Sequence, residues 1–162
     1  MGNNHIDFSK VIEWSDFTKT HQEDVDEAKG MYQEAKNFLE FYDWCLDVNQ
    51  SYIGILHPGI LGVFLFRISP SNENVDEWIW VLVGDIPPAY LTTEECPNPA
   101  CALDGYIGAM EEWVDAVEKE KPIDKLIPVN VAATKENGER LKKRLAFLDK
   151  KVLPSYSADL QN

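Results

Sequence analysis

The sequence predicts an α+β fold, in which a small antiparallel sheet of about three strands is packed by a long N-terminal helix and two C-terminal helices. A helical stripe of apolar residues covers positions 21–47, three β-type runs follow up to position 83, and two further helical patterns fill the second half. The chain has 162 residues and 44% apolar composition, enough for one buried core. We expect one domain over 1–162, with 1–19 as an N-terminal arm or short helix.

The first long helix is predicted over 21–47, in "HQEDVDEAKGMYQEAKNFLEFYDWCLD". Thr20 and Glu23 have the spacing of a capping box, and acids crowd the first turn. The apolar positions alternate by three and four, which is the spacing of one helix face: Val25, Ala28, Tyr32, Ala35, Leu39, Tyr42 and Leu46. We therefore expect this face, including Leu39 and Leu46, to be buried against the sheet.

Two β-type runs, 52–56 and 60–68, flank the tight-turn sequence "HPG" and predict a hairpin. A third strand is predicted over 77–83. These runs are apolar at nearly every position, which is typical of a sheet covered on both faces. Gly54 and Gly62 then mark bulges or places where a helix approaches the sheet closely.

The second half of the sequence has the pattern of two helices. Asn98 and Pro99 form a helix start, and "EKEKP" ends that helix. Thr134 caps the last helix, and Pro154 ends it, so that 155–162 is expected to be a flexible tail. The expected buried faces are Leu103, Ile107, Met110, Val114 and Val117 in the first, and Leu141, Leu145, Leu148 and Val152 in the second.

The stretch "WVLVGDIPPAYL" raises one question about chemistry. Asp85 follows an apolar strand, so it is either a turn residue or a working carboxylate at a strand end. Gly84 permits an unusual backbone angle, and Pro87 and Pro88 force an extended exit. A general acid or base needs a positioned partner, and the nearest acids in sequence lie on a polar loop without histidine. The pattern favours the turn.

No nucleophile, metalloprotease, phosphate-binding or dinucleotide motif is present, so no catalytic residue and no cofactor are expected, and enzymatic activity is not favoured. Trp78 and Trp80 share one face of their strand, either beneath a helix or in a binding surface. If the protein is instead a small enzyme or ligand-binding protein, its site would use Asp85, Tyr90, His57 and Arg67.

Three cysteines fit a reducing compartment better than a disulfide scaffold. Cys45 is expected to be a small core residue. Cys96 and Cys101 flank "PNPA", but a metal site would need two more ligands and no histidine neighbours them in sequence. No metal site is predicted. No window reaches the roughly 18 apolar residues of a membrane helix, and the N-terminus has no signal-peptide pattern. The sequence thus indicates a cytoplasmic protein.

The chain is strongly acidic, with 28 acids and 15 bases giving a net charge of −13. Residues 1–133 hold 24 acids and 8 bases, a net charge of −16, whereas residues 134–162 hold 4 acids and 7 bases, a net charge of +3. Nucleic acids and anionic membranes are disfavoured as partners because both need a positive surface. A basic protein partner is favoured electrostatically, although the same charge also serves solubility.

The pattern of residues 76–154, from the Gly-Asp-hydrophobic-Pro corner of "WVLVGDIPPAYL" through the two C-terminal helices, resembles a group of small bacterial proteins. The resemblance implies a bacterial cytoplasmic domain and carries no activity.

Small size, acidity and the absence of catalytic motifs predict a protein-interaction module, most concretely an immunity- or antitoxin-type inhibitor that binds a basic protein such as a toxin. The carboxylates expected to bind it are Glu23, Asp24, Asp26, Glu27, Glu111, Glu112 and Asp115.

Overall fold

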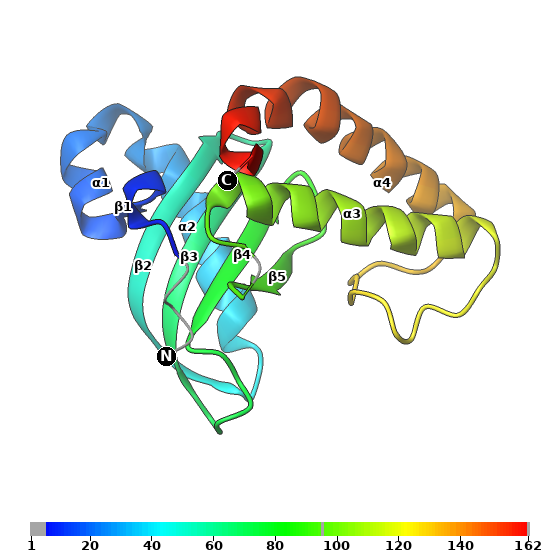
Figure 1. Ribbon diagram of the computed structural model, residues 1–162, viewed down its shortest axis with the longest axis horizontal. Coiled ribbons are helices and arrows are strands. Elements are labelled where there is room, and N and C mark those ends of the chain that lie inside the picture. Colours follow the sequence, from blue (N-terminus) through cyan, green and yellow to red (C-terminus); the bar gives the residue numbers. More distant parts are fainter. Residues whose placement is uncertain (1–5, 95, 162) are drawn as a thin grey trace.

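The computed structural model describes residues 6–94 and 96–161 and has an α+β fold. Its five-stranded antiparallel sheet has the order β1-β2-β3-β4-β5, so each strand pairs with the next one in sequence (Figure 1). The strands are β1 (Ile12–Glu13), β2 (Cys45–His57), β3 (Leu61–Pro70), β4 (Trp78–Gly84) and β5 (Ala89–Thr92). The α-helices are α1 (Trp14–Thr20), α2 (Val25–Glu40), α3 (Pro99–Glu118) and α4 (Lys135–Phe147).

The predicted hairpin and third strand correspond to β2, β3 and β4. The prediction of about three strands missed β1 and β5, because each is too short to give an apolar pattern. Among the described residues, no helix has the length and apolar character needed to cross a membrane.

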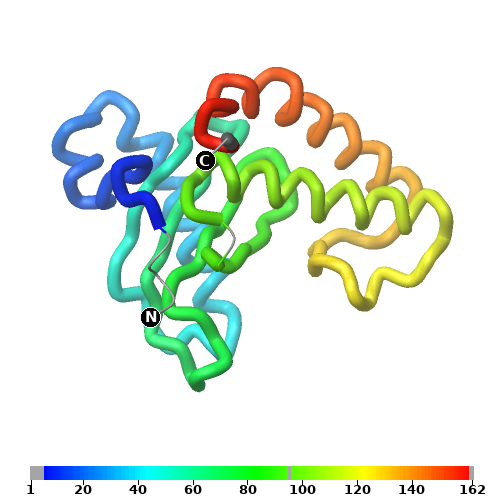
Figure 2. The backbone as a smooth tube through the Cα atoms, in the orientation of Figure 1, coloured from blue at the N-terminus to red at the C-terminus, as the bar shows by residue number. Residues whose placement is uncertain are grey.

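Helices cover both faces of the sheet, with α2 on one face and α3 and α4 on the other (Figures 1 and 2). The side chains of β3 and β4 point alternately to the two sides, and both sides are buried. Leu61, Val63, Leu65, Trp78, Trp80 and Leu82 pack with α3 and α4. Phe64, Phe66, Ile68, Ile79, Val81 and Val83 pack with α2. This arrangement confirms that the continuous apolar runs reflect a sheet covered on both faces, and it places Trp78 and Trp80 in the core.

The predicted long helix is divided into two helices. Thr20 is the last residue of α1, and its hydroxyl donates to the carbonyl of Asp16 at 2.9 Å. A short 3₁₀ turn, Gln22–Asp24, then leads into α2. The predicted capping box at Thr20 is therefore wrong: residues before it already form a helix, so Thr20 ends one helix and does not begin the next.

The α2 helix also ends earlier than the apolar stripe predicts. It stops at Glu40, a turn follows, and β2 begins at Cys45. Leu39 is fully buried, as predicted, whereas Leu46 is 66% exposed, so the prediction of a buried Leu46 is wrong. Aromatic residues in the turn continued the helical spacing by coincidence. Cys45 is buried, as predicted.

Gly54 lies at an irregularity in the β2–β3 register, between Ile53 and Ile55. A Cβ atom at this position would clash with the ring of Pro99, the first residue of α3. The sequence prediction of a bulge or a close helix approach is confirmed at Gly54, and both are present.

Both C-terminal helices begin as predicted. The side chain of Asn98 accepts a hydrogen bond from the Cys101 amide at 2.9 Å, and Thr134 accepts one from the Asn137 amide at 3.1 Å. The predicted faces are buried: Leu103, Ile107, Met110, Val114, Val117, Leu141, Leu145, Leu148 and Val152.

The chain does not leave its helical path at Pro154. A π-helical segment, Leu148–Val152, and a 3₁₀ helix, Leu153–Gln161, continue from α4. Tyr156 hydrogen bonds with His57 at 2.9 Å, and Asp159 forms an ion pair with Lys10 at 3.0 Å. These contacts with distant segments hold residues 155–161 in place, so the prediction of a flexible tail is wrong for them. Local sequence does not reveal such contacts. Residue 162 lies outside the described residues.

Candidate functional site

The corner between β4 and β5 holds Asp85, and it is built from a tight turn that requires glycine. Gly84 has φ +137°, and a Cβ atom there would overlap the carbonyl of Ile60. The Asp85 amide donates to that same carbonyl at 3.1 Å. On the other side, the buried Tyr106 hydroxyl donates to the carbonyl of Pro87 at 2.7 Å. The expected role of Gly84 in a sharp turn is confirmed, since only glycine adopts this angle freely.

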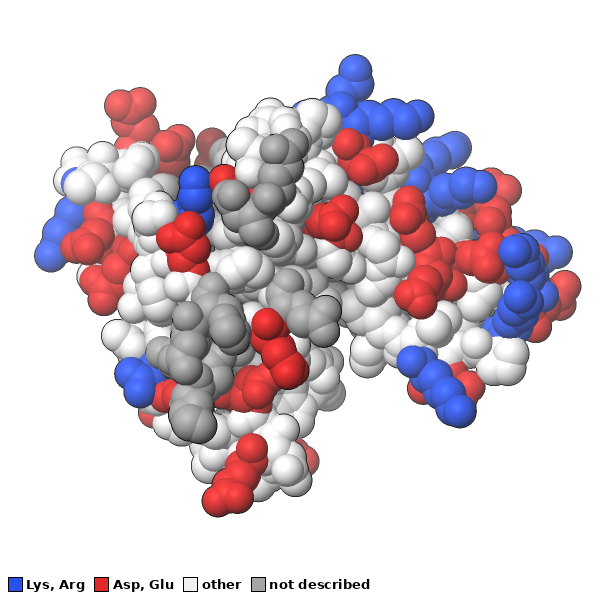
Figure 3. Space-filling view, in the orientation of Figure 1, with Lys and Arg blue, Asp and Glu red and all other residues white. Residues whose placement is uncertain are grey.

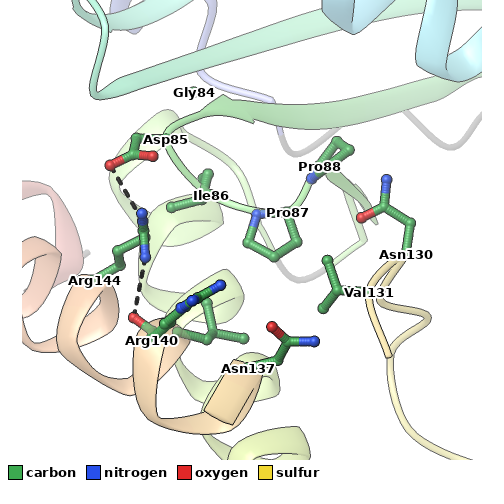
Figure 4. Close-up of a pocket in the computed structure, with 11 residues that line it drawn as sticks. Gly84, Asp85, Ile86, Pro87, Pro88, Asn130, Val131, Asn137, Arg140 and Arg144 are labelled. Atoms are coloured by element: carbon green, nitrogen blue, oxygen red, sulfur yellow. Dashed lines mark hydrogen bonds and ion pairs between the residues drawn. The ribbon is translucent and has the colours of Figure 1, made fainter. Parts of the chain in front are cut away.

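The Asp85 side chain faces α4. Its carboxylate forms an ion pair with Arg144 Nε at 3.2 Å, and Arg144 Nη1 donates to the carbonyl of Arg140 at 3.4 Å (Figure 4). Arg140 in turn pairs with Glu136 at 3.0 Å. Asp85 was expected to be a turn residue, and in the structure it lies in the turn with its carboxylate paired with Arg144 of α4.

A hollow of about 330 Å³ lies between this corner and α4 (Figure 4). The lining combines an apolar floor with polar side chains: Gly84, Asp85, Ile86, Pro87, Pro88, Asn130, Val131, Asn137, Arg140, Leu141 and Arg144. It offers guanidinium and amide donors that could hold a small anion. The lining contains no serine, cysteine, histidine, lysine or tyrosine, and its one carboxylate, Asp85, is paired with Arg144.

The structure does not bring the other residues of the alternative ligand site to this hollow. His57 ends β2 and bonds to Tyr156. Arg67 pairs with Glu77 and lies 5.7 Å from the centre of the Trp78 ring. Tyr90 packs among aromatic residues near α2. Asp85, Tyr90, His57 and Arg67 thus occupy separate environments.

The predicted acidic residues form two groups. Glu23 and Asp24 lie in the 3₁₀ turn before α2, and Asp26 and Glu27 lie in its first turn; all four are exposed. No described cation is within ion-pair distance of them. The second group, on α3, lies on the opposite face of the sheet.

The α3 group is partly compensated. Asp115 pairs with Lys119 at 2.9 Å, and the hydrogen bond from Lys119 lowers the pKa of Asp115. Lys142 and Lys150 of α4 and its extension face Glu111 and Asp115 across a hollow between the helices. Figure 3 shows this arrangement, with Lys and Arg side chains along α4 beside Asp and Glu side chains on α3. Glu111 and Glu112 are exposed and have no ion pair among the described residues.

Sequence reasoning missed an aromatic cluster at the end of α2. We call it the aromatic surface, and it consists of Phe38, Phe41, Tyr42, Trp44 and Tyr90. Each ring contacts at least one other, and Phe41 is 81% exposed while the remaining four are half-buried. The sequence feature that could have revealed it is the dense aromatic segment "FLEFYDW", which the prediction assigned to the apolar face of the helix over 21–47.

Carboxylates border the aromatic surface. Glu40 and Asp43 lie within the same segment of chain, and Asp76 lines a hollow of about 170 Å³ together with Trp44 and Tyr90. None of these carboxylates has an ion pair with a described residue. Burial, followed by the neighbouring Tyr90, raises the pKa of Tyr42. The surface therefore offers aromatic faces next to unpaired negative charge.

Within 6–94 and 96–161, no group of three or more His, Cys, Asp or Glu residues is arranged to hold a metal ion. Comparisons of the chain with protein-family models, curated proteins and solved structures give no match.

Proposed function

We propose that this protein is an acidic interaction module that binds a basic protein partner, most concretely as an immunity- or antitoxin-type inhibitor of a toxin. The observation that carries the proposal is the excess of unpaired carboxylates. The chain has 28 acids, whereas the ion pairs of the described residues engage only seven carboxylates: Glu77, Asp85, Asp115, Glu118, Glu120, Glu136 and Asp159.

Unpaired carboxylates at a surface repel one another in the free protein, and a cationic partner relieves this repulsion. They also accelerate the encounter with a positive surface and discourage acidic partners. Solubility requires net charge but no particular partner. The proposal therefore differs from the solubility explanation in one respect: binding must depend on carboxylates at defined positions.

The test uses capture by the immobilised protein and two variants of the α3 group. Glu111→Lys with Glu112→Lys reverses two unpaired charges, and Glu111→Gln with Glu112→Gln removes them at nearly the same size. We expect the wild type to capture a protein of net positive charge that salt displaces, with capture weakened by the neutral pair and weakened further by the reversed pair. A captured partner that is acidic, or equal capture by all three proteins, would contradict the proposal.

The hollow beside Asp85 supports a second candidate, the binding of a small anionic ligand. Arg140, Arg144, Asn130 and Asn137 converge there over an apolar floor. If this is a carboxylate site, succinate at a concentration of about 10 mM should raise the melting temperature of the wild type, because a ligand that binds only the folded state stabilises it. Arg144→Gln should abolish the rise. An equal rise in the variant would exclude this site.

A further inference from the structure

We infer that the aromatic surface is the docking face for the basic partner and that an arginine or lysine side chain of the partner enters the hollow between Trp44, Tyr90 and Asp76. This inference rests on the proposed function and names the face that serves it. It differs from the sequence-based expectation, which placed binding at carboxylates on η2 (Gln22–Asp24), α2 and α3.

The rings form one continuous surface. Tyr42 stacks on Trp44 with ring centres 4.9 Å apart, and Tyr90 meets Trp44 at 5.0 Å and Tyr42 at 5.3 Å. Phe41 extends the surface outward and contacts Tyr42 at 5.7 Å. Tryptophan and tyrosine dominate the energetics of protein interfaces, and a contiguous exposed apolar patch marks an interaction site more often than a scattered residue does.

The hydroxyls of Tyr42 and Tyr90 add hydrogen-bonding groups to this face. Neither hydroxyl makes a hydrogen bond with a described residue, although each can donate one and accept one. They are therefore free to bond to a partner. The buried Tyr106, in contrast, donates its hydroxyl to the carbonyl of Pro87.

The charge around the rings selects a cation. Asp76 lines the same hollow as Trp44 and Tyr90, and Glu40 and Asp43 lie in the adjoining chain, all three without an ion pair to a described residue. A guanidinium or ammonium group is attracted both by a carboxylate and by the face of an aromatic ring. The methylene stem of the same side chain covers apolar ring surface.

The protein already contains this arrangement elsewhere, with its own cation in place. Arg67 lies 5.7 Å from the centre of the Trp78 ring and forms an ion pair with Glu77. Trp44 and Asp76 repeat the combination of tryptophan and carboxylate, but no described arginine or lysine pairs with Asp76. We therefore assign the cation at Trp44 to the partner.

The test is an NMR titration with a tetra-arginine amide peptide at low salt, followed through the indole N–H signals and the backbone amides. Tetra-lysine and tetra-glutamate peptides are the comparison probes. The variants are Asp76→Asn and Phe41→Ser. Their matched controls are Glu139→Gln, an exposed carboxylate on α4 without an ion pair to a described residue, and Phe147→Ser, an aromatic residue 45% exposed at the end of α4.

We expect tetra-arginine to shift the Trp44 indole signal in a saturable manner, with tetra-lysine weaker and tetra-glutamate inactive. Asp76→Asn and Phe41→Ser should each weaken binding by about three- to tenfold, the size of one or two cation–π or aromatic contacts. Glu139→Gln and Phe147→Ser should bind as the wild type does. This pattern would support the assigned face.

Three outcomes would overturn the inference. If tetra-arginine binds but shifts only amides around Glu23 or Glu111, the proposed function stands and the aromatic surface is not its docking face. If tetra-arginine does not bind at all, both fail. If sedimentation shows a dimer that Phe41→Ser dissociates, a second copy of this chain occupies the surface.

Discussion

The Arg144 guanidinium and the Asp85 carboxylate form an ion pair, 3.2 Å from Nε to Oδ2, that joins α4 to the corner between β4 and β5. Both side chains are substantially exposed, at 41% for Arg144 and 65% for Asp85. The pair therefore adds little to the position of α4, which its buried Leu141 and Leu145 determine, while the corner itself depends on Gly84, Ile60 and the Tyr106–Pro87 hydrogen bond.

We predict that Asp85→Asn lowers the free energy of unfolding by less than about 1 kcal/mol, because an exposed ion pair contributes little. Gly84→Ala should cost more, about 1–3 kcal/mol, because alanine is strained at φ +137° and its Cβ would meet the Ile60 carbonyl. Urea denaturation of both variants checks the order. An Asp85→Asn variant that keeps wild-type stability but loses all measured activity would show that Asp85 has a chemical role beyond the corner.

Leu39→Ala should cost about 2–5 kcal/mol, the range for truncating a buried leucine. Leu39 is fully buried between α2 and the sheet. Leu46→Ala is the matched control, because Leu46 is 66% exposed and its truncation should change stability by less than about 0.5 kcal/mol. Urea melts that gave equal losses for the two variants would contradict the end of α2 at Glu40.

Stability should fall at alkaline pH because of Tyr106. Burial raises the pKa of the Tyr106 phenol in the folded protein, whereas the unfolded phenol ionises near its ordinary value of about 10. The contribution of this phenol to stability is therefore complete below pH ~10 and is lost as pH rises above it, because only the unfolded chain releases the proton.

The check is the dependence of the urea midpoint on pH between about 8 and 11. Tyr106→Phe should be less stable than the wild type below pH ~10, since the Pro87 carbonyl loses its donor. It should also lose less stability between pH ~10 and 11 than the wild type does. Tyr42, Tyr52 and Tyr156, whose pKa values burial also raises, remain in the variant and account for the residual slope. Identical slopes would contradict the assignment to Tyr106.

The sequence predicted correctly those features that depend on residues close to one another in the chain. The caps at Asn98 and Thr134, the hairpin at "HPG" and the close approach at Gly54 all depend on residues within a few positions of one another or on a missing side chain. The continuous apolar runs of β3 and β4 likewise predicted a sheet covered on both faces.

The predictions that failed concern segments whose conformation depends on contacts with residues far away in sequence. The spacing of Tyr42 and Leu46 continued the α2 stripe, yet Tyr42 packs against Tyr90 of β5, and the chain turns into β2. The strand β1 has two residues and exists only because it pairs with Tyr52 and Ile53. The segment after Pro154 is held by His57 and Lys10, which are far away in sequence.

The candidate site was only partly predictable for the same reason. Sequence identified Asp85 at a strand end, but Arg144 is 59 positions further on and no periodicity relates the two. The aromatic surface brings "FLEFYDW" together with Tyr90 and Asp76, and only the antiparallel packing of β4 and β5 beside α2 places them together.

The most direct test of the proposed function is the rate at which the captured partner associates at about 50 and 300 mM salt. The Debye length, over which charges act on one another, shortens appreciably across this range. We predict that the wild-type rate falls markedly with salt while the dissociation rate changes little, as expected for electrostatic steering. Glu111→Lys with Glu112→Lys should associate more slowly at 50 mM and show a flatter dependence, with the fold unchanged. A wild-type association rate that is independent of salt would contradict the electrostatic account and leave the charge of −13 as a determinant of solubility alone.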